Sequence, residues 1–117
     1  MMLTKSHWHA DTSEPLLSST VGDVIFDRAA THPDRTALIA EGHDGITKYL
    51  SYSALLDEAV RSAGTLLQLA DPGDRVALFA PNLLEWPVIE YGAMLSGIIL
   101  VAVNPGLQVP ELTYMLE

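Results

Sequence analysis

The chain has 117 residues, enough for one small domain with a buried core but not for two domains of ordinary size. Hydrophobic residues make up 49% of it and charged residues 18%, which excludes an intrinsically disordered protein. The net charge of −9 argues against nucleic acid and anionic membrane surfaces as partners, and the absence of cysteine excludes disulfides, thiolate metal sites and cysteine nucleophiles.

Residues 1–19 are polar and irregular, and we interpret them as a flexible N-terminal tail before an ordered region at residues 20–117. The tail lacks the apolar run of a secretory signal peptide. The longest apolar stretch, residues 93–103, is about half of the roughly 20 residues that cross a bilayer, so we expect no transmembrane helix. We therefore expect a soluble protein, and we place it in the cytoplasm.

The ordered region is expected to begin with a helix and a β-hairpin. Thr20 and Asp23 have the spacing of a helix N-cap and its partner, and apolar residues follow at helical intervals. The segment at residues 32–34 ends this helix because the residue before a proline disfavours the α conformation. Two short β-prone segments, residues 36–40 and 46–50, flank a glycine-rich turn, which predicts the hairpin.

A longer helix is predicted at residues 51–69. Its apolar side chains recur at helical intervals on one face, at Tyr52, Leu55, Leu56, Ala59, Val60, Ala63 and Leu67. The other face is polar, and Asp57 and Arg61 have the spacing of a favourable ion pair. We expect one buried and one solvent-exposed face.

The second half of the chain alternates strands with helices. Residues 75–80 and 98–103 are apolar at nearly every position, which is typical of strands covered on both faces. The helix between them forms a crossover, which makes the two strands parallel, and residues 109–117 begin a further helix. The predicted fold class is α/β, a partial N-terminal subdomain in which a βαβ unit and a β-hairpin form the sheet and helices cover it.

The helix between the two buried strands has recognisable ends. Asn82 and Glu85 have the spacing of a capping pair that begins it, and Gly97 stops it after Ser96. Pro87 lies just past the predicted first turn, where it removes one backbone hydrogen bond, so we expect a kink there.

These strands are very apolar for a sheet with so few members. A parallel sheet ordinarily needs more neighbouring elements to cover it. We therefore interpret residues 20–117 as an incomplete piece of a larger domain. Such a piece leaves apolar surface and an open sheet edge, which favour self-association, with exchanged helices as one form of it.

Common catalytic motifs are absent from this chain or incomplete in it. Residues 92–97 have the two glycines of a phosphate-binding loop, but Ile98 follows where lysine is required, and the segment ends a helix instead of beginning one. The dinucleotide fingerprint G-x-G-x-x-G and the nucleophile elbow G-x-S-x-G are both absent. We predict that the chain contains no catalytic, cofactor-binding or metal-ligating residue.

Each histidine has a possible functional role, but we favour a structural interpretation for all four. His7 and His9, beside Asp11, have the spacing of a transition-metal chelate, but a mobile tail explains them more simply. His32 precedes a proline and His43 lies in the hairpin turn, positions typical of solvated turn residues.

Four other features receive structural interpretations. Asp57 and Glu58 resemble a carboxylate pair, but neighbours on a helix point in different directions. Trp86 near a helix start is typical of core or interface packing. Lys5 and Lys48, in the tail and the hairpin, are poorly placed for a catalytic lysine.

Four stretches are notable for their order and spacing: HPDRTAL at residues 32–38, YLSYSALLDE at 49–58, PGDRVALFAPN at 72–82 with Glu85-Trp86 following, and LSGIILVAVNP at 95–105. Together they resemble the N-terminal end of the adenylate-forming superfamily of acyl-CoA synthetases, luciferases and nonribosomal-peptide adenylation domains. Ala54 departs from that pattern, which usually has glutamate there. The EW and NP pairs are most similar to those of medium- and long-chain fatty acyl-CoA synthetases.

The resemblance implies a two-step ligase that converts a carboxylate and Mg-ATP into an acyl-adenylate and then into an acyl-CoA. ATP, magnesium and coenzyme A are implied for the full-length parent, whose phosphate loop, ribose-binding acidic residue and catalytic lysine lie beyond this chain. The piece is therefore expected to be structural, inactive alone and partnered by the remainder of the synthetase chain. Gly106 stands where many relatives carry a basic residue, so the resemblance implies no coenzyme A contact there.

Two alternatives stay open at this point. The chain is compatible with a stand-alone α/β interaction or regulatory module, although a receiver-like module requires an acidic pair after its first strand and Glu41 stands alone. A third possibility is a naturally truncated gene product that acts as a partner to another synthetase chain.

Overall fold

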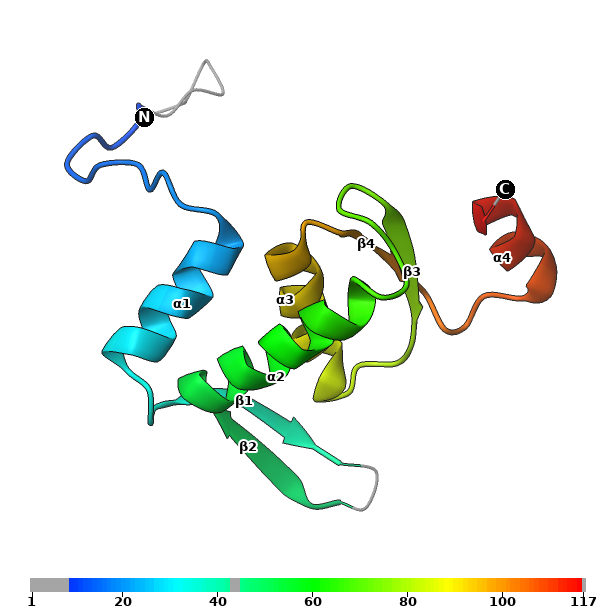
Figure 1. The fold of residues 1–117 in the computed structure, drawn as a ribbon, viewed down its shortest axis with the longest axis horizontal. Helices are drawn as coiled ribbons and strands as arrows, with labels where there is room; N and C mark the ends of the chain where they lie inside the picture. Colours follow the sequence, from blue (N-terminus) through cyan, green and yellow to red (C-terminus); the bar gives the residue numbers. More distant parts are fainter. Residues whose placement is uncertain (1–8, 43–44, 117) are drawn as a thin grey trace, which may run out of the picture.

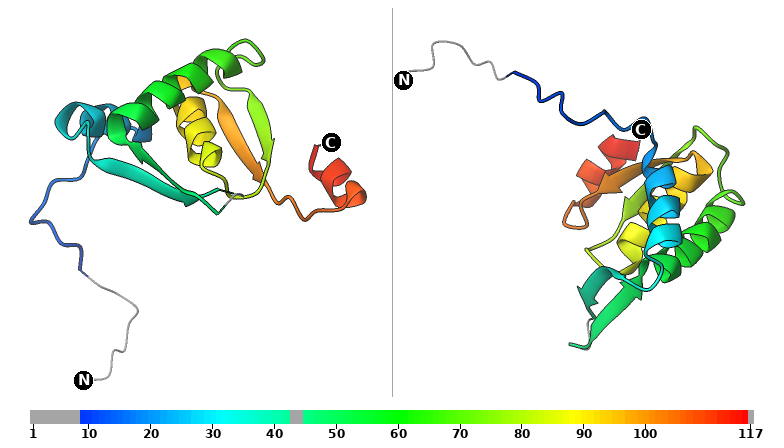
Figure 2. Two further views of the ribbon diagram at one scale, coloured as in Figure 1. Left: turned by 90° about the horizontal axis from the view of Figure 1, so that it is seen from below. Right: turned by 90° about the vertical axis from the view of Figure 1, so that its left-hand side faces the viewer.

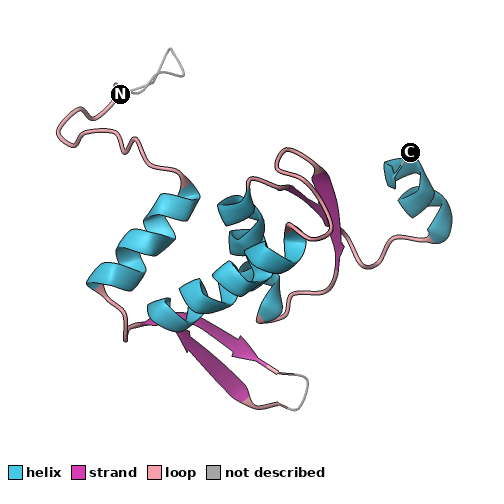
Figure 3. Ribbon diagram, viewed as in Figure 1, coloured by secondary structure: helices cyan, strands magenta, loops and turns pink. Residues whose placement is uncertain are grey.

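The fold was taken from a computed structural model, which describes residues 9–42 and 45–116. Within this part, the helices and strands are α1 (Val21–Thr31), β1 (Thr36–Glu41), β2 (Thr47–Ser51), α2 (Tyr52–Leu66), β3 (Arg75–Phe79), α3 (Glu85–Ser96), β4 (Ile99–Val103) and α4 (Val109–Leu116) (Figure 1). Their order confirms the predicted α/β class (Figure 3). Residues 9–20 form neither helix nor strand, and the division at residue 19 stays a prediction.

Helix α1 begins with the predicted cap. The backbone N–H of Asp23 donates to the Thr20 hydroxyl oxygen at 3.1 Å, and the backbone N–H of Thr20 donates to the Asp23 carboxylate at 2.8 Å. These reciprocal bonds satisfy donors that a helix N-terminus otherwise leaves unpaired. The helix ends at His32, and it packs against α2 and α3 through Ile25 and Ala29.

Strands β1 and β2 form the predicted antiparallel hairpin. Residues 43–44 in its turn, including His43, lie outside the described part. The hairpin leads directly into α2, because Ser51 is both the last residue of β2 and the N-cap of α2. The outward face of the hairpin carries Ile39 and Tyr49, which are paired across the two strands and exposed.

Helices α2 and α3 cross at the centre of the molecule, as Figure 1 shows. The residues buried between and beneath them are mostly small: Leu55, Ala59, Ala63 and Leu66 on α2, and Gly92, Ala93 and Ser96 on α3. Small side chains let the two helix backbones approach closely, so this crossing forms a tightly packed layer.

Strands β3 and β4 pair in parallel, with Arg75 opposite Ile99 and Phe79 opposite Val103. One face of the pair rests on the helical layer through a cluster of buried and half-buried residues: Leu66, Ala70, Val76, Ala93, Ile98 and Leu100. The left-hand view of Figure 2 shows α2 and α3 on one side of the pair. The predicted strand–helix–strand unit with parallel strands is confirmed.

The structure corrects the prediction of one covered sheet. Among the described residues, β1–β2 and β3–β4 form two separate two-stranded sheets. Residues 75, 77 and 79 are exposed, so β3 is covered on one face instead of two. An apolar strand sequence indicates that burial of both faces is favourable, but it does not show whether these residues include the element that covers them.

The start of α3 also differs from the prediction. Leu84 is the N-cap and makes no side-chain capping bond, so the predicted Asn82–Glu85 capping pair is wrong. Pro87 is consequently the third residue of the helix. At this position its missing N–H has no intrahelical partner to lose, which removes the physical reason for a kink.

Helix α4 stands apart from the other elements (Figure 1). Residues 104–108 connect it to β4, and no other described helix or strand packs closely on its backbone. All residues of α4 are exposed except Leu112, which is half-buried. In the described part of the chain, no helix is both long enough and apolar enough to cross a bilayer.

Candidate functional site

The carboxyl ends of β3 and β4 are the expected position of a ligand site, because parallel α/β sheets bind ligands in the crevice beyond these ends. The chain leaves β3 through residues 80–84 into α3, and it leaves β4 through residues 104–108 into α4. Both connections therefore bring a helix N-terminus toward the same edge of the sheet.

The N-terminus of α3 is a poor cradle for a phosphate. A phosphate requires free backbone N–H groups and a positive local potential. Pro87 lacks an N–H, Glu85 adds a negative charge in the first turn, and the backbone N–H of Trp86 donates to the Leu83 carbonyl at 3.1 Å. This turn therefore does not fit ATP or the phosphates of coenzyme A.

In the turn after β4, backbone N–H groups also donate to acceptors within the turn. The backbone N–H of Gly106 donates to the Asn104 side-chain oxygen at 2.9 Å, and that of Leu107 donates to the Asn104 carbonyl at 3.1 Å. At the start of α4, the backbone N–H of Gln108 donates to the Glu111 carboxylate at 2.8 Å. The turn therefore holds its shape through internal bonds, and Gly106 supplies no cation for a coenzyme A phosphate.

A shallow groove separates the hairpin from the start of α3. Its largest part has a volume of about 410 Å³ and is lined by Leu38, Ile39, Ala40, Glu41, Asn82, Leu83, Leu84 and Pro87. An adjoining part of about 190 Å³ adds Lys48 and Glu85. Most of the lining residues are apolar, and the one lysine, Lys48, is accompanied by two glutamates, Glu41 and Glu85, which disfavours an anionic ligand.

The histidines and acidic residues do not form a metal site in the described residues, where no group of three or more histidine, aspartate and glutamate side chains gathers. Asp11 instead accepts a hydrogen bond from the backbone N–H of Ser13 at 2.9 Å, and hydrogen bonding with Ser13 lowers the pKa of Asp11. His32 is half-buried at the end of α1. His7 and Lys5 lie outside the described part.

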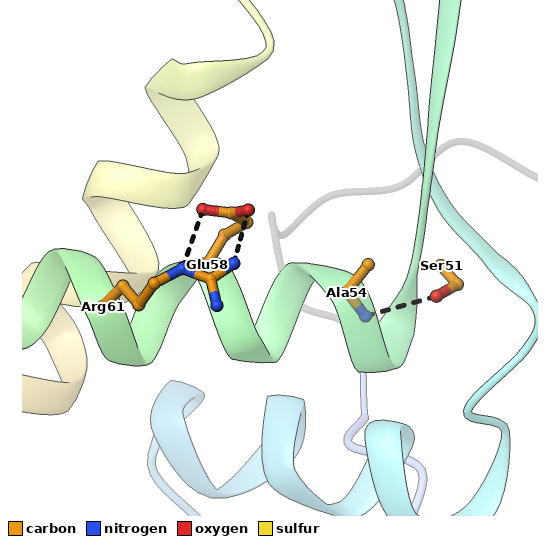
Figure 4. A network of polar contacts seen from close by, with 4 residues as sticks. All are labelled: Ser51, Ala54, Glu58 and Arg61. Carbon is orange, nitrogen blue, oxygen red and sulfur yellow. Dashed lines mark hydrogen bonds and ion pairs between the residues drawn. The ribbon is translucent and has the colours of Figure 1, made fainter.

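On α2, Glu58 pairs with Arg61 through contacts of 2.5 and 3.4 Å (Figure 4). The predicted ion pair between Asp57 and Arg61 is therefore wrong, because the guanidinium of Arg61 pairs with Glu58 instead. Hydrogen bonding and the charge of Glu58 raise the pKa of Arg61, with a smaller contribution from Asp57. The structural interpretation of Asp57 and Glu58 stays a prediction.

The two glycines of the phosphate-loop-like segment have structural roles. Gly97 adopts a left-handed conformation with φ of 72° and caps α3, its N–H donating to the Ala93 carbonyl. Gly92 lies inside α3, where a Cβ atom would stand 2.5 Å from the Ser62 hydroxyl oxygen on α2. Sequence reasoning missed this contact. The signal for it in the sequence is the succession of small residues in both helices.

The remaining candidates occupy ordinary positions. Trp86 is half-buried in the first turn of α3, and Lys48 is exposed on β2. Ser51 caps α2 by accepting a hydrogen bond from the backbone N–H of Ala54 at 3.2 Å (Figure 4). The described residues therefore offer packing and capping contacts, and the prediction that the chain lacks a site of its own stays a prediction.

Comparison with known proteins gives the family. Residues 25–117 match the model of the AMP-binding enzyme family. The medium-chain acyl-CoA ligase ACSF2 of Danio rerio is 36% identical over 116 residues, which are 98% of this chain and 19% of that relative. The human protein of the same name is 35% identical over 107 residues, which are 91% of this chain and 17% of that relative.

Solved structures agree with these relatives. The fatty acyl CoA synthetase of Mycobacterium tuberculosis has a TM-score of 0.75 and 32% identity, covering 83% of this chain and 19% of that one. The N-terminal domain of FACL13 from the same organism has a TM-score of 0.74 and 32% identity, covering 83% of this chain and 24% of that domain. The chain spans about a fifth of the length of these relatives. It belongs to the AMP-binding enzyme family, which confirms the resemblance to acyl-CoA synthetases.

Proposed function

We propose that these residues act as the N-terminal segment of an ATP-dependent acid–CoA ligase that activates a fatty acid. The observation that best supports this proposal is the 36% identity, over 98% of the chain, with a relative named medium-chain acyl-CoA ligase. The agreement with a fatty acyl CoA synthetase at a TM-score of 0.75 supports the same activity. The reaction joins the acid to AMP with loss of pyrophosphate, and then exchanges AMP for the thiol of coenzyme A.

The role of this segment is structural. Neither turn at the carboxyl ends of β3 and β4 fits a phosphate, because the donors there are used or missing and Glu85 and Glu111 add negative charge. We therefore assign no chemical step to these residues, and ATP, magnesium and coenzyme A belong to the rest of the ligase. The segment contributes the crossed helices α2 and α3 and the parallel strands that lie on them.

The assignment makes the remainder of the ligase the main partner of this segment. For location we retain the cytoplasm as the proposal, although the ACSF2 relatives are named as mitochondrial. Fractionation of the native cell, followed by immunoblotting, tests it. Recovery of the protein in an organelle or membrane fraction would contradict a cytoplasmic location.

The test of the activity uses the product of the native gene. That product should release AMP only when a fatty acid, ATP and coenzyme A are all present, with straight-chain acids of increasing length as substrates. Isothermal titration of the 117-residue chain with Mg-ATP should show no binding. Absence of acid-dependent AMP release by the gene product contradicts the ligase, whereas saturable ATP binding by the short chain contradicts only its structural role.

A further inference from the structure

We draw no further inference here: the strongest candidate, the shallow and mainly apolar groove between the β1–β2 hairpin and the start of α3, carries nothing, because none of the described residues shows what covers it.

Discussion

Gly92 on α3 lies against Ser62 on α2 so closely that a Cβ atom at residue 92 would stand 2.5 Å from the serine hydroxyl oxygen and 2.7 Å from its Cβ. The backbone nitrogen of Ala63 would be 3.0 Å away. Such separations are far below van der Waals contact, so the helix crossing at the centre of the fold depends on glycine at this position.

Gly92→Ala is therefore expected to destabilise the chain by about 1–3 kcal/mol, the usual cost of forcing an extra carbon into a packed interface. Urea unfolding followed by circular dichroism measures the change. Adding Ser62→Gly to this variant should recover part of the loss, because it removes the two shortest contacts but not the one with Ala63.

Gly64→Ala on α2 is the control for this substitution. A Cβ atom at residue 64 meets nothing within 4 Å, so the only effect should be the better helix propensity of alanine. We expect a stabilisation of about 0.5–1 kcal/mol. Destabilisation by Gly64→Ala, or no effect of Gly92→Ala, would show that the two helices do not cross as described.

The start of α2 should depend on Ser51 more than on the ion pair further along the helix. Ser51→Ala removes the acceptor of the Ala54 backbone N–H and is expected to cost about 1 kcal/mol. Arg61→Gln breaks an exposed pair with Glu58 and should change the free energy of unfolding little, since solvent screens such pairs. Chemical unfolding of both variants in low and high salt measures the difference. A larger loss for Arg61→Gln would reverse this ranking.

Asp23 should make the stability of α1 depend on pH in the acidic range. Hydrogen bonds from the backbone N–H of Thr20 and then from its hydroxyl lower the pKa of Asp23 below its ordinary value of 3.8. A pKa lower in the folded state means that the stabilisation is complete above the unfolded pKa and is lost as the pH falls through the folded value.

Asp23→Asn should accordingly destabilise the chain at neutral pH, and its difference from the parent should shrink below about pH 4. Unfolding measured across a pH series checks this. Asp27→Asn removes the same charge from α1 without touching the cap, and it should not reproduce the pH-dependent difference. A difference between Asp23→Asn and the parent that stays constant with pH would contradict the capping role.

The isolated chain is expected to self-associate through β3 and β4. Among the described residues, β3 and β4 pair only with each other and expose Phe79 and Ile99, so a second copy can bind at these apolar side chains and open strand edges. Sedimentation velocity over a range of concentrations should show a species heavier than the monomer, and Phe79→Asp should reduce it. A monodisperse monomer at high concentration contradicts the prediction.

Local patterns in the sequence predicted the elements of the fold well. The Thr20–Asp23 cap and the hairpin follow from contacts within a few residues, and the structure contains both. The apolar stripe predicted for α2 is buried at Leu55, Ala59 and Ala63, but the prediction is wrong at Val60 and Leu67, which are exposed. The start of α3 was predicted wrongly because Asn82 has the spacing of a cap, whereas Leu84 takes the position without a capping side chain.

The features that sequence reasoning missed depend on residues distant in the chain. The contact between Gly92 and Ser62 exists only because two helices cross, and the small residues on both helices do not by themselves indicate which pair meets. The exposed side of β3 has a related explanation, since an apolar strand sequence favours burial but does not show which element covers the strand. Family motifs identified the relatives, and the prediction that the motif residues form no site in this chain stays a prediction.

The central claim is that these residues are one segment of a longer fatty acid–CoA ligase. The most direct measurement is the intact mass of the native gene product, coupled to its acid-, ATP- and coenzyme A-dependent release of AMP. Because 116 residues are 19% of the zebrafish relative, that relative has about 600 residues, and we predict an active product of similar size. A product of 117 residues that releases no AMP would contradict the claim.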